Sequence, residues 1–287
     1  MKAIYKNELA TYFSTLIGYI VIAFLLLFAG IFTSYICLKH ASAGFQYVLS
    51  NMTLVFLIVV PILTMRTFSE ERKQKTEALL YSSPVTTTQI VLGKYFALLT
   101  MLLIPLLVVS LVPILLGQFG NIYYVAAYAS IVGFFILGAA LLAIGMFISS
   151  LTDIQILAAG LTFVILLVNY FLTSIAPFIN TAAFVGLIAL ICAVILVAVI
   201  VALILKNWLP GVIIGIAGIT VVVIIHLVNP VAYTNLLMVA MEKIALFDRY
   251  NSLMYNVVDL RDMLFLVSVA VIFVFLTVQS LEKRRWS

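Results

Sequence analysis

Long runs of apolar residues, separated by short polar segments, fill most of the chain. Each run is close to the length of about 20 residues that an α-helix needs to cross the hydrocarbon core of a bilayer. The eight runs cover residues 16–38, 47–67, 95–117, 122–148, 156–176, 182–205, 209–228 and 263–281. This pattern predicts an all-α polytopic membrane protein in which residues 1–287 form a single transmembrane domain of about eight helices.

The composition fits the same class. Hydrophobic residues make up 66% of the chain and charged residues 9%, against roughly 25% charged residues in an ordinary soluble domain. The formal net charge is +5, but basic residues in membrane proteins normally record topology. The charge therefore does not indicate nucleic-acid binding. The first apolar run lacks the small-residue cleavage site of a signal peptide, so we expect it to be retained.

Two of the apolar runs, 182–205 and 209–228, are separated only by Lys206, Asn207 and Trp208. Pro210 and Gly211 follow this gap, and both residues suit a tight reversal of the chain. We therefore expect a pair of helices over 182–228 and not one long helix.

The lysines and arginines are distributed unevenly between the two sides of the predicted bundle. With eight spans, both termini lie on one side, where the connecting segments carry eleven Lys and Arg residues against four on the opposite side. The positive-inside rule then predicts that both termini and the segment 66–94 are cytoplasmic, in a multi-pass protein of the cytoplasmic membrane. Removing the 182–228 pair leaves this orientation unchanged.

One connecting segment concentrates charge. Seven charged residues lie between Arg66 and Glu77, and inserting them at about 3 kcal/mol each would cost on the order of 20 kcal/mol. The segment therefore stays outside the hydrocarbon core. The local sequence nevertheless predicts a helix, because Ser69 can cap a helix that has Glu70 and Glu71 in its first turn.

Further signals place a second helix after the first. Ser83-Pro84 favours the end of the first helix, and Thr86-x-x-Gln89 is typical of a capping box that opens the next one. The sequence thus predicts a charged helical hairpin over residues 68–94, with a short apolar patch around Leu79 and Leu80. Two interpretations stay open at this point: a solvated loop that only sets topology, and an ordered surface that docks a soluble partner.

The N-terminal residues 2–15 predict an interfacial helix. Its apolar positions recur at helical spacing on one face, which suits a helix lying along the inner leaflet. They are Ile4, Tyr5, Leu9, Tyr12 and Phe13. The alternative is a frayed extension of the first span.

Polar side chains inside the apolar runs are few. Asn169 and His226 are the candidates for groups that face the bundle interior, because unpaired polar groups are costly in hydrocarbon. Interhelical hydrogen bonding is the favoured role for both, ahead of ligand binding. Gly145-x-x-x-Ser149 has the small-residue spacing that permits close approach of helices.

The stretch PILTMRTFSEERKQKTEALLYSSPVTTTQIVLGKYFALL is similar to the second span, cytoplasmic hairpin and third span of ABC-2-type exporter permeases. The N-terminal MKAIYKNELATYFSTLIGYIVIAF and the C-terminal LFDRYNSLMYNVVDLRDMLFLVSVAVIFVFLTVQSLEKRRW resemble the gliding-motility branch, which is related to the copper-linked nitrous-oxide-reductase maturation permease. The family has a type V exporter-like bundle with six spans. The 182–228 pair departs from it as two extra helices.

The resemblance implies that the chain is a permease subunit coupled to ATP hydrolysis by other subunits. Two cytosolic ABC ATPase subunits would dock on the hairpins of this chain and of a second permease copy or paralogue, and relatives can also work with a membrane-anchored auxiliary protein. The resemblance assigns ATPase coupling to Lys73, Gln74, Lys75, Glu77, Leu79, Leu80, Tyr81 and Ser83. It also implies short helices in the extracytoplasmic segment 229–262, for which a plain surface loop is the alternative.

The chain carries no recognisable ATP site. Gly93-Lys94 lacks the rest of the phosphate-binding motif, since Thr88 and Tyr95 stand where Gly and Ser/Thr are required. We expect no catalytic, cofactor or metal residue here, with ATP and magnesium held by the partner ATPase. An ion-coupled secondary transporter would place charges deep in the spans, and an intramembrane enzyme would need a catalytic cluster at one depth. Neither pattern is apparent.

Overall fold

The computed structural model describes residues 1–39, 44–73, 85–118, 120, 122–178, 235–255 and 260–285, and short pieces between 187 and 222. It divides into two units, Met1–Tyr170 with Leu246–Ser287, and Phe171–Ala245. All regular elements in the described residues are helical. The hairpin tip 74–84 and most of the 182–228 pair lie outside the described residues.

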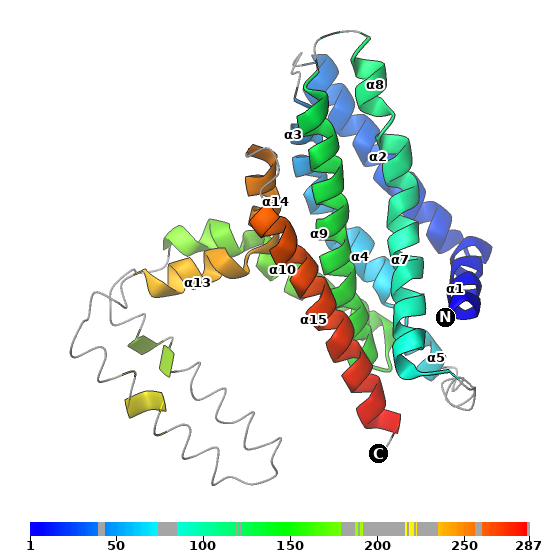
Figure 1. The fold of residues 1–287 in the computed structure, drawn as a ribbon, viewed down its shortest axis with the longest axis vertical. Coiled ribbons are helices and arrows are strands. Elements are labelled where there is room, and N and C mark those ends of the chain that lie inside the picture. The colour runs from blue at the N-terminus through cyan, green and yellow to red at the C-terminus, as the bar shows by residue number, and fades with distance from the viewer. Residues whose placement is uncertain are drawn as a thin grey trace. The chain divides into compact units, whose positions relative to one another are not determined.

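Twelve α-helices are assigned within the described residues (Figure 1). They are α1 (Lys2–Ser14), α2 (Leu16–Thr33), α3 (Phe45–Met52), α4 (Phe56–Thr64), α5 (Ser69–Lys73), α7 (Thr87–Val109), α8 (Val112–Leu116), α9 (Tyr124–Leu151), α10 (Gln155–Ile175), α13 (Leu236–Ile244), α14 (Leu246–Tyr255) and α15 (Leu260–Arg285). Short turns of π- or 3-10 helix continue α2, join α3 to α4 and follow α10.

Six helical stretches in the described residues are long and apolar enough to cross a membrane. They are Leu16–Leu38, Phe45–Lys73, Thr87–Leu116, Tyr124–Leu151, Gln155–Ile175 and Leu260–Lys283. The prediction of an all-α polytopic membrane protein is confirmed. The third stretch begins at Thr87, eight residues before the predicted start of its apolar run, because α7 runs from Thr87 into that run without a break.

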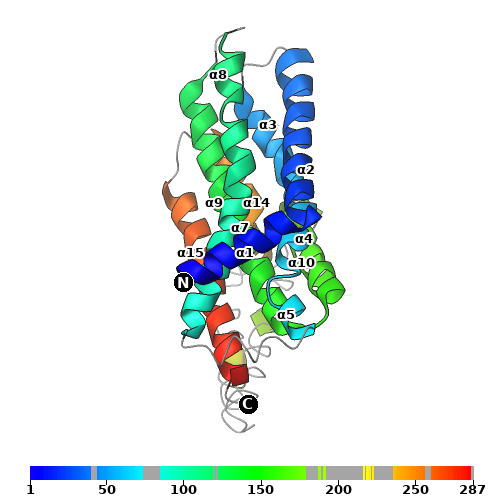
Figure 2. The ribbon, with the colours of Figure 1, turned by 90° about the vertical axis from the view of Figure 1, so that its right-hand side faces the viewer.

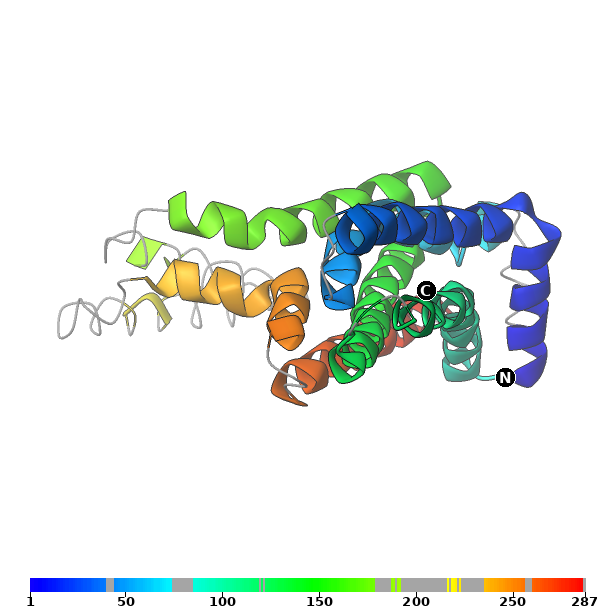
Figure 3. The same cartoon turned by 90° about the horizontal axis from the view of Figure 1, so that it is seen from above.

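Helix α9 is the centre of the larger unit. Figure 3, the view from above, shows α9 amid α3, α7, α14 and α15, all of which contact it. Glycines let α4 approach closely: a Cβ added at Gly145 would lie 2.4 Å from Thr64 Oγ1. Phe56 and Phe134 stack between the same two helices with ring centroids 4.3 Å apart. The predicted close approach at Gly145 is therefore confirmed.

The chain bends sharply between α1 and α2, so that the two helices point in different directions. Thr15, between α1 and α2, has extended backbone angles (φ −101°, ψ 150°), which end the first helix and turn the chain. Figure 2 shows α1 lying across α7. The bend is tight, because a Cβ at Gly18 would lie only 2.5 Å from the Tyr12 carbonyl oxygen. A side chain at position 18 would force the two helices apart.

Helix α14 packs into the larger unit through polar and aromatic contacts. The Leu246 N–H at its start donates to Asn169 Oδ1 on α10 at 3.0 Å, and Ser50 Oγ on α3 donates to Asn251 Oδ1 at 2.9 Å. Tyr250 is fully buried with its ring 6.0 Å from that of Phe134. Residues 246–255 of the predicted segment 229–262 thus form a packed helix and not a plain surface loop.

The smaller unit, Phe171–Ala245, has two described elements in contact with each other. The 3-10 turn Ala176–Phe178 packs on α13, which begins after Asn235. Asn235 has a positive φ of 62°, a conformation that asparagine tolerates better than most residues.

Candidate functional site

The charged hairpin has two roots in the structure: α5 on its N-terminal side and the start of α7 on its C-terminal side. The residues that fix these roots form the candidate site. Each root makes polar contacts with other helices of the larger unit.

The first anchor is Lys94 on α7, whose exposed fraction is only 2%. Its Nζ donates to Glu8 Oε1 on α1 at 2.5 Å, to Glu71 Oε1 on α5 at 2.7 Å and to the Thr67 carbonyl oxygen at 2.9 Å. A lysine ammonium has three N–H donors, so all three are used. One buried cation therefore joins α1, α5 and α7. We call Lys94, Glu8, Glu71 and Thr67 the Lys94 cluster.

The surroundings of the cluster explain why a charge is tolerated here. The side chains of Glu8 and Glu71 are 16% and 23% exposed, so both carboxylates keep some contact with solvent while Lys94 does not. Lys94 Nζ also lies 5.3 Å from the centre of the Phe68 ring, a favourable position for a cation. Removing one partner from a buried ion pair typically costs about 3–5 kcal/mol, because the other charge is left uncompensated.

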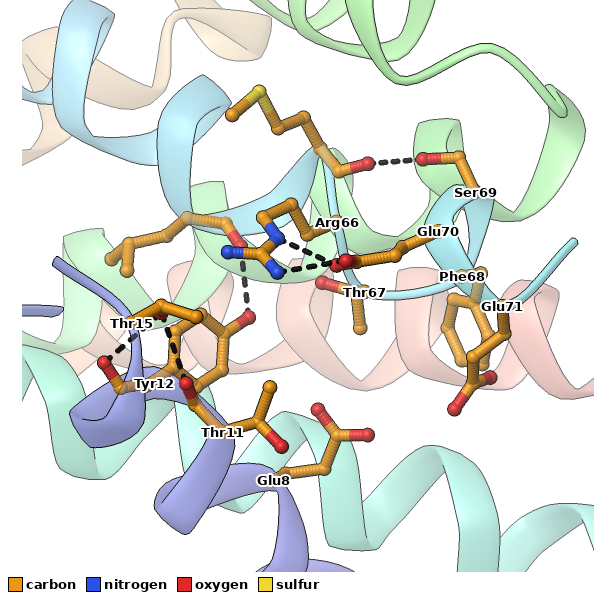
Figure 4. A network of polar contacts seen from close by, with 12 residues as sticks. Glu8, Thr11, Tyr12, Thr15, Arg66, Thr67, Phe68, Ser69, Glu70 and Glu71 are labelled. Atoms are coloured by element: carbon orange, nitrogen blue, oxygen red, sulfur yellow. Dashed lines mark hydrogen bonds and ion pairs between the residues drawn. The ribbon is translucent and has the colours of Figure 1, made fainter. Parts of the chain in front are cut away.

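The second anchor joins α1 to the end of α4 (Figure 4). The Tyr12 hydroxyl donates to the Leu63 carbonyl oxygen at 2.9 Å. The last carbonyls of a helix lack intrahelical partners, so Tyr12 satisfies one of them. Burial raises the pKa of Tyr12 above its ordinary value, which keeps the hydroxyl protonated and able to donate.

Figure 4 also shows Arg66 forming a two-pronged ion pair with Glu70. Arg66 Nε and Nη2 donate to the two carboxylate oxygens at 2.5 and 2.8 Å. This pair spans the turn between α4 and α5 at helical i,i+4 spacing. It stiffens the chain just before the hairpin, since a two-pronged Arg–carboxylate pair fixes orientation as well as distance.

The start of α5 is capped by a neighbouring helix. Ser149 Oγ on α9 accepts from the Phe68 and Ser69 N–H groups at 3.2 and 3.4 Å. The prediction that Ser69 caps this helix is wrong, because its hydroxyl donates back to the Met65 carbonyl oxygen. The turn from α4 continues into α5 and brings this carbonyl, four residues earlier, within reach of Ser69.

The end of α5 is held by the connection between α9 and α10. Arg72 is 8% exposed, and its Nη1 donates to the Thr152 carbonyl oxygen and to Asp153 Oδ1, each at 3.4 Å. Lys73, one residue later, is exposed at the end of α5. The transition from buried arginine to exposed lysine marks where the hairpin leaves the bundle.

The second root begins with the predicted cap. Thr86 Oγ1 accepts from the Gln89 N–H at 3.3 Å, so this half of the capping box is confirmed. The next residue, Thr87, is buried and donates through Oγ1 to Glu282 Oε1 on α15 at 2.8 Å. The start of α7 is thereby attached to the last described helix of the chain.

The predicted site residues fall partly within this region. Lys73 is the one ATPase-coupling candidate among the described residues. Gln74, Lys75, Glu77, Leu79, Leu80, Tyr81, Ser83 and the polar candidate His226 lie outside them. Asn169 faces a neighbouring helix, where it holds the start of α14.

The apolar face of the N-terminal helix contacts protein in the structure. Ile4 lies against Gly93 on α7, where an added Cβ would be 3.1 Å from an Ile4 methyl group. The hydroxyls of Tyr5 and Thr100 are 2.9 Å apart, and Leu9 and Phe13 pack on the core with Tyr12. Lys2 and Lys6 are exposed. The apolar face of residues 2–15 thus packs partly across α7, and its position along the inner leaflet stays a prediction.

Sequence reasoning missed the Lys94 cluster. The charge pattern assigns Lys94 to the cytoplasmic segment 66–94, whereas in the structure its side chain is buried on α7. Two signals could have identified it: Lys94 is a single charge inside the apolar helix TTQIVLGKYFALLTMLLIPLLVV, and Glu8 lies four residues before Tyr12 on the apolar side of α1. A charge placed in each of two apolar faces indicates a pair. The partner carboxylate Glu71 has no comparable signal.

The arrangement suits mechanical attachment better than chemistry. In the described residues no group of three or more His, Cys, Asp or Glu side chains could hold a metal ion. Lys94 has no N–H donor left to activate a substrate, and its partners lie on α1, on α5 and in the turn before α5. These features fix the positions of helices relative to one another.

Comparison with family models and curated proteins identifies no family for this chain. No protein-family model matches the chain, and no curated protein matches it.

Proposed function

We propose that this chain is the transmembrane permease subunit of an ABC-2-type ATP-binding cassette transporter. In this proposal a separate cytosolic ATPase subunit binds and hydrolyses ATP, and the permease converts its movement into export or mechanical work. The chain itself is not an enzyme and holds no cofactor, because ATP and magnesium stay on the partner.

One observation carries the proposal: both roots of the charged hairpin are tied to other helices by polar contacts in which one side chain is buried. Lys94 and Tyr12 attach the first root to α7 and α1, and Arg72 attaches it to the α9–α10 connection. Thr87 attaches the second root to α15. A loop that only sets topology needs basic residues, but it needs none of these buried attachments, which cost desolvation.

The attachments would give the hairpin a mechanical role. A docked ATPase would push on Lys73 to Ser83, and the rigid roots would pass the displacement to four or more membrane helices. The complex would contain two ATPase subunits and a second permease copy or paralogue, with the hairpin on the cytoplasmic side and a type V exporter-like bundle. The sequence resemblance supports each of these features, and a membrane-anchored auxiliary protein is compatible with them.

The competing proposal is an ion-coupled secondary transporter. Such a transporter uses ionisable groups inside its spans, and Lys94 is a buried charge on a span. However, the three donors of Lys94 are all used by fixed partners at the hairpin end of α7. This favours a structural attachment over a site that binds and releases ions.

The test is the purification of the tagged chain in mild detergent from its native membrane. We expect a cytosolic ATPase to co-purify and the complex to hydrolyse ATP. Leu79→Asp and Leu80→Asp should lose both properties. Tyr123→Asp is the matched control, since Tyr123 is 75% exposed and precedes α9, away from the hairpin. An isolated chain that transports solutes on an ion gradient alone would contradict the proposal.

A further inference from the structure

A groove lies between α7, α9 and α15 in the larger unit, on the opposite side of α7 from the Lys94 cluster. Its volume is about 640 Å³, which falls within the range of roughly 300–1,000 Å³ found for small-molecule sites. The groove and the second root meet at one end, where Thr88 at the start of α7 and Glu282 on α15 line the groove. Nothing in the proposed function assigns a role to it.

Small residues create the groove. Ala139 on α9 and Ala270 on α15 face it, and neither side chain is large enough to fill the space between the helices. On the other face of α9, a Cβ at Gly138 would lie 2.4 Å from Leu102 and 2.9 Å from Phe56. Helix α9 is thus packed tightly on one face and left hollow on the other.

The wall of the groove is apolar along most of its length. Phe96 and Phe135 line it together with aliphatic side chains of α15. The hydroxyl of Tyr95 donates to the Ala139 carbonyl oxygen at 2.9 Å, so this polar group is satisfied within the wall. A water molecule in such a space would find few hydrogen-bond partners. A hydrocarbon chain makes no hydrogen bonds and therefore loses none there.

The groove is polar at one end only. Thr88, Gln279 and Glu282 line the end where α7 begins and α15 finishes. From Val267 to Glu282 the lining extends about 22 Å along α15 at 1.5 Å per residue, which exceeds the roughly 15 Å depth of half a bilayer core. The shape and polarity therefore match an amphiphile with its head at this end and its chain along the helices.

Glu282 decides the chemistry of the head. Its Oε1 accepts from Thr87 Oγ1 at 2.8 Å, which fixes the carboxylate at the mouth of the groove. A carboxylate has about four acceptor positions on its two oxygens, so it can also accept from an ammonium group. Charge-assisted hydrogen bonds of this kind are roughly twice as strong as neutral ones.

We propose that the groove binds one acyl chain of a phospholipid whose head carries a primary ammonium, as in phosphatidylethanolamine, with that ammonium on Glu282. The lipid belongs to the leaflet on the hairpin side of the bundle. A trimethylated head cannot donate a hydrogen bond to Glu282, and a glycerol head lacks the positive charge. The site therefore selects a lipid by its headgroup as well as by its acyl chain.

The test uses the full chain in phosphatidylcholine nanodiscs that contain a small fraction of phosphatidylethanolamine with a photoreactive acyl chain. We expect cross-links on α9 and α15 inside the groove. Unlabelled phosphatidylethanolamine should compete about tenfold better than phosphatidylcholine or phosphatidylglycerol, as one charge-assisted hydrogen bond would give. Equal competition by the three lipids would overturn the headgroup assignment.

Two variants distinguish recognition of the lipid's acyl chain from recognition of its headgroup. Ala270→Trp fills the groove and should abolish labelling there, whereas Ala23→Trp, on an exposed position of α2, should leave it unchanged. Glu282→Gln keeps an acceptor for Thr87, so it should preserve folding and labelling but abolish the preference for the ammonium head. Full labelling in Ala270→Trp would overturn the site. So would cross-linking of Ala270→Cys to a second copy of the chain, because protein would then occupy the groove.

Discussion

The ammonium of Lys94 and the carboxylate of Glu8 lie 2.5 Å apart, although 86 positions separate them in the sequence. This pair attaches an amphipathic N-terminal helix to the third membrane-crossing stretch at the level of the charged hairpin. Glu71 joins the same ammonium from the hairpin side at 2.7 Å. The position of α1 is thus tied directly to the root of the hairpin.

Neutralising Lys94 should destabilise the larger unit more than any other single charge change in α1 or α7. In Lys94→Met the carboxylates of Glu8 and Glu71 would face each other without a cation, so we expect a loss of about 3 kcal/mol, at the lower end of the range for buried pairs because both acids are partly solvated. Thermal unfolding in detergent measures the change. Lys6→Met, an exposed lysine on α1, is the control.

The same experiment has an internal check. Adding Glu8→Gln to Lys94→Met removes one uncompensated carboxylate and should recover part of the lost stability, since neighbouring charges do not act additively. If Lys94→Met were no worse than Lys6→Met, the buried cluster would not exist in solution.

The hydroxyl of Tyr12 should contribute separately from its ring. Tyr12→Phe keeps the packing of a residue that is 5% exposed but removes the bond to the Leu63 carbonyl oxygen. We expect a loss of about 1–2 kcal/mol, because a buried carbonyl is left unsatisfied. Tyr19→Phe, at a position 56% exposed on α2, should have no measurable effect. Equal unfolding temperatures for the two variants would contradict the assigned bond.

The close approach of α9 to α4 makes a prediction about glycine. Gly145→Ala places a Cβ 2.4 Å from Thr64 Oγ1, so the helices must separate, and overpacking of this kind costs about 1–3 kcal/mol. Gly160→Ala on α10 meets nothing within 4 Å and should be neutral or stabilising by up to about 1 kcal/mol through helix propensity. Combining Gly145→Ala with Thr64→Ala should recover stability, and a failure to do so would place the clash elsewhere.

Local sequence patterns predicted some features well because the contacts involved are short in sequence. Thr86 caps α7 through a residue only three positions away, and six of the eight apolar runs overlap helices in the described residues that are long and apolar enough to cross a membrane. The small-residue spacing of Gly145 and Ser149 permits close packing of helices. Each of these features depends on the properties of one segment, so no knowledge of the rest of the fold was needed.

Other features depend on which segments meet, and local patterns do not contain that information. Ser69 has the right position and chemistry for a cap, but Ser149 of another helix takes that role. Lys94 could be assigned to the cytoplasmic segment because its partner Glu8 lies 86 positions away in the sequence. The groove of α7, α9 and α15 arises from two alanines on different helices. In each case a distant partner decides the outcome.

The two roles proposed for the hairpin, docking and transmission, should separate in a last pair of variants. Lys73 is exposed at the end of α5 and belongs to the proposed docking segment, whereas Glu71, two residues earlier, contacts Lys94. Because the two residues lie on the same short helix, each is a matched control for the other. Neither substitution involves the Phe68 and Ser69 N–H groups, which donate to Ser149 Oγ.

We expect Lys73→Gln to weaken association with the ATPase, as loss of one rim charge does at a protein interface, while leaving the unfolding temperature unchanged. Glu71→Gln should leave association intact but uncouple the subunits, because a neutral amide holds Lys94 less strongly and the root can move independently of α7. Pull-down of the ATPase measures docking, and the dependence of ATP hydrolysis on the permease measures transmission. The opposite pattern would reverse the assignment of the two residues. In that pattern Glu71→Gln would abolish binding of the ATPase, and Lys73→Gln would still bind the ATPase but lose the dependence of ATP hydrolysis on the permease.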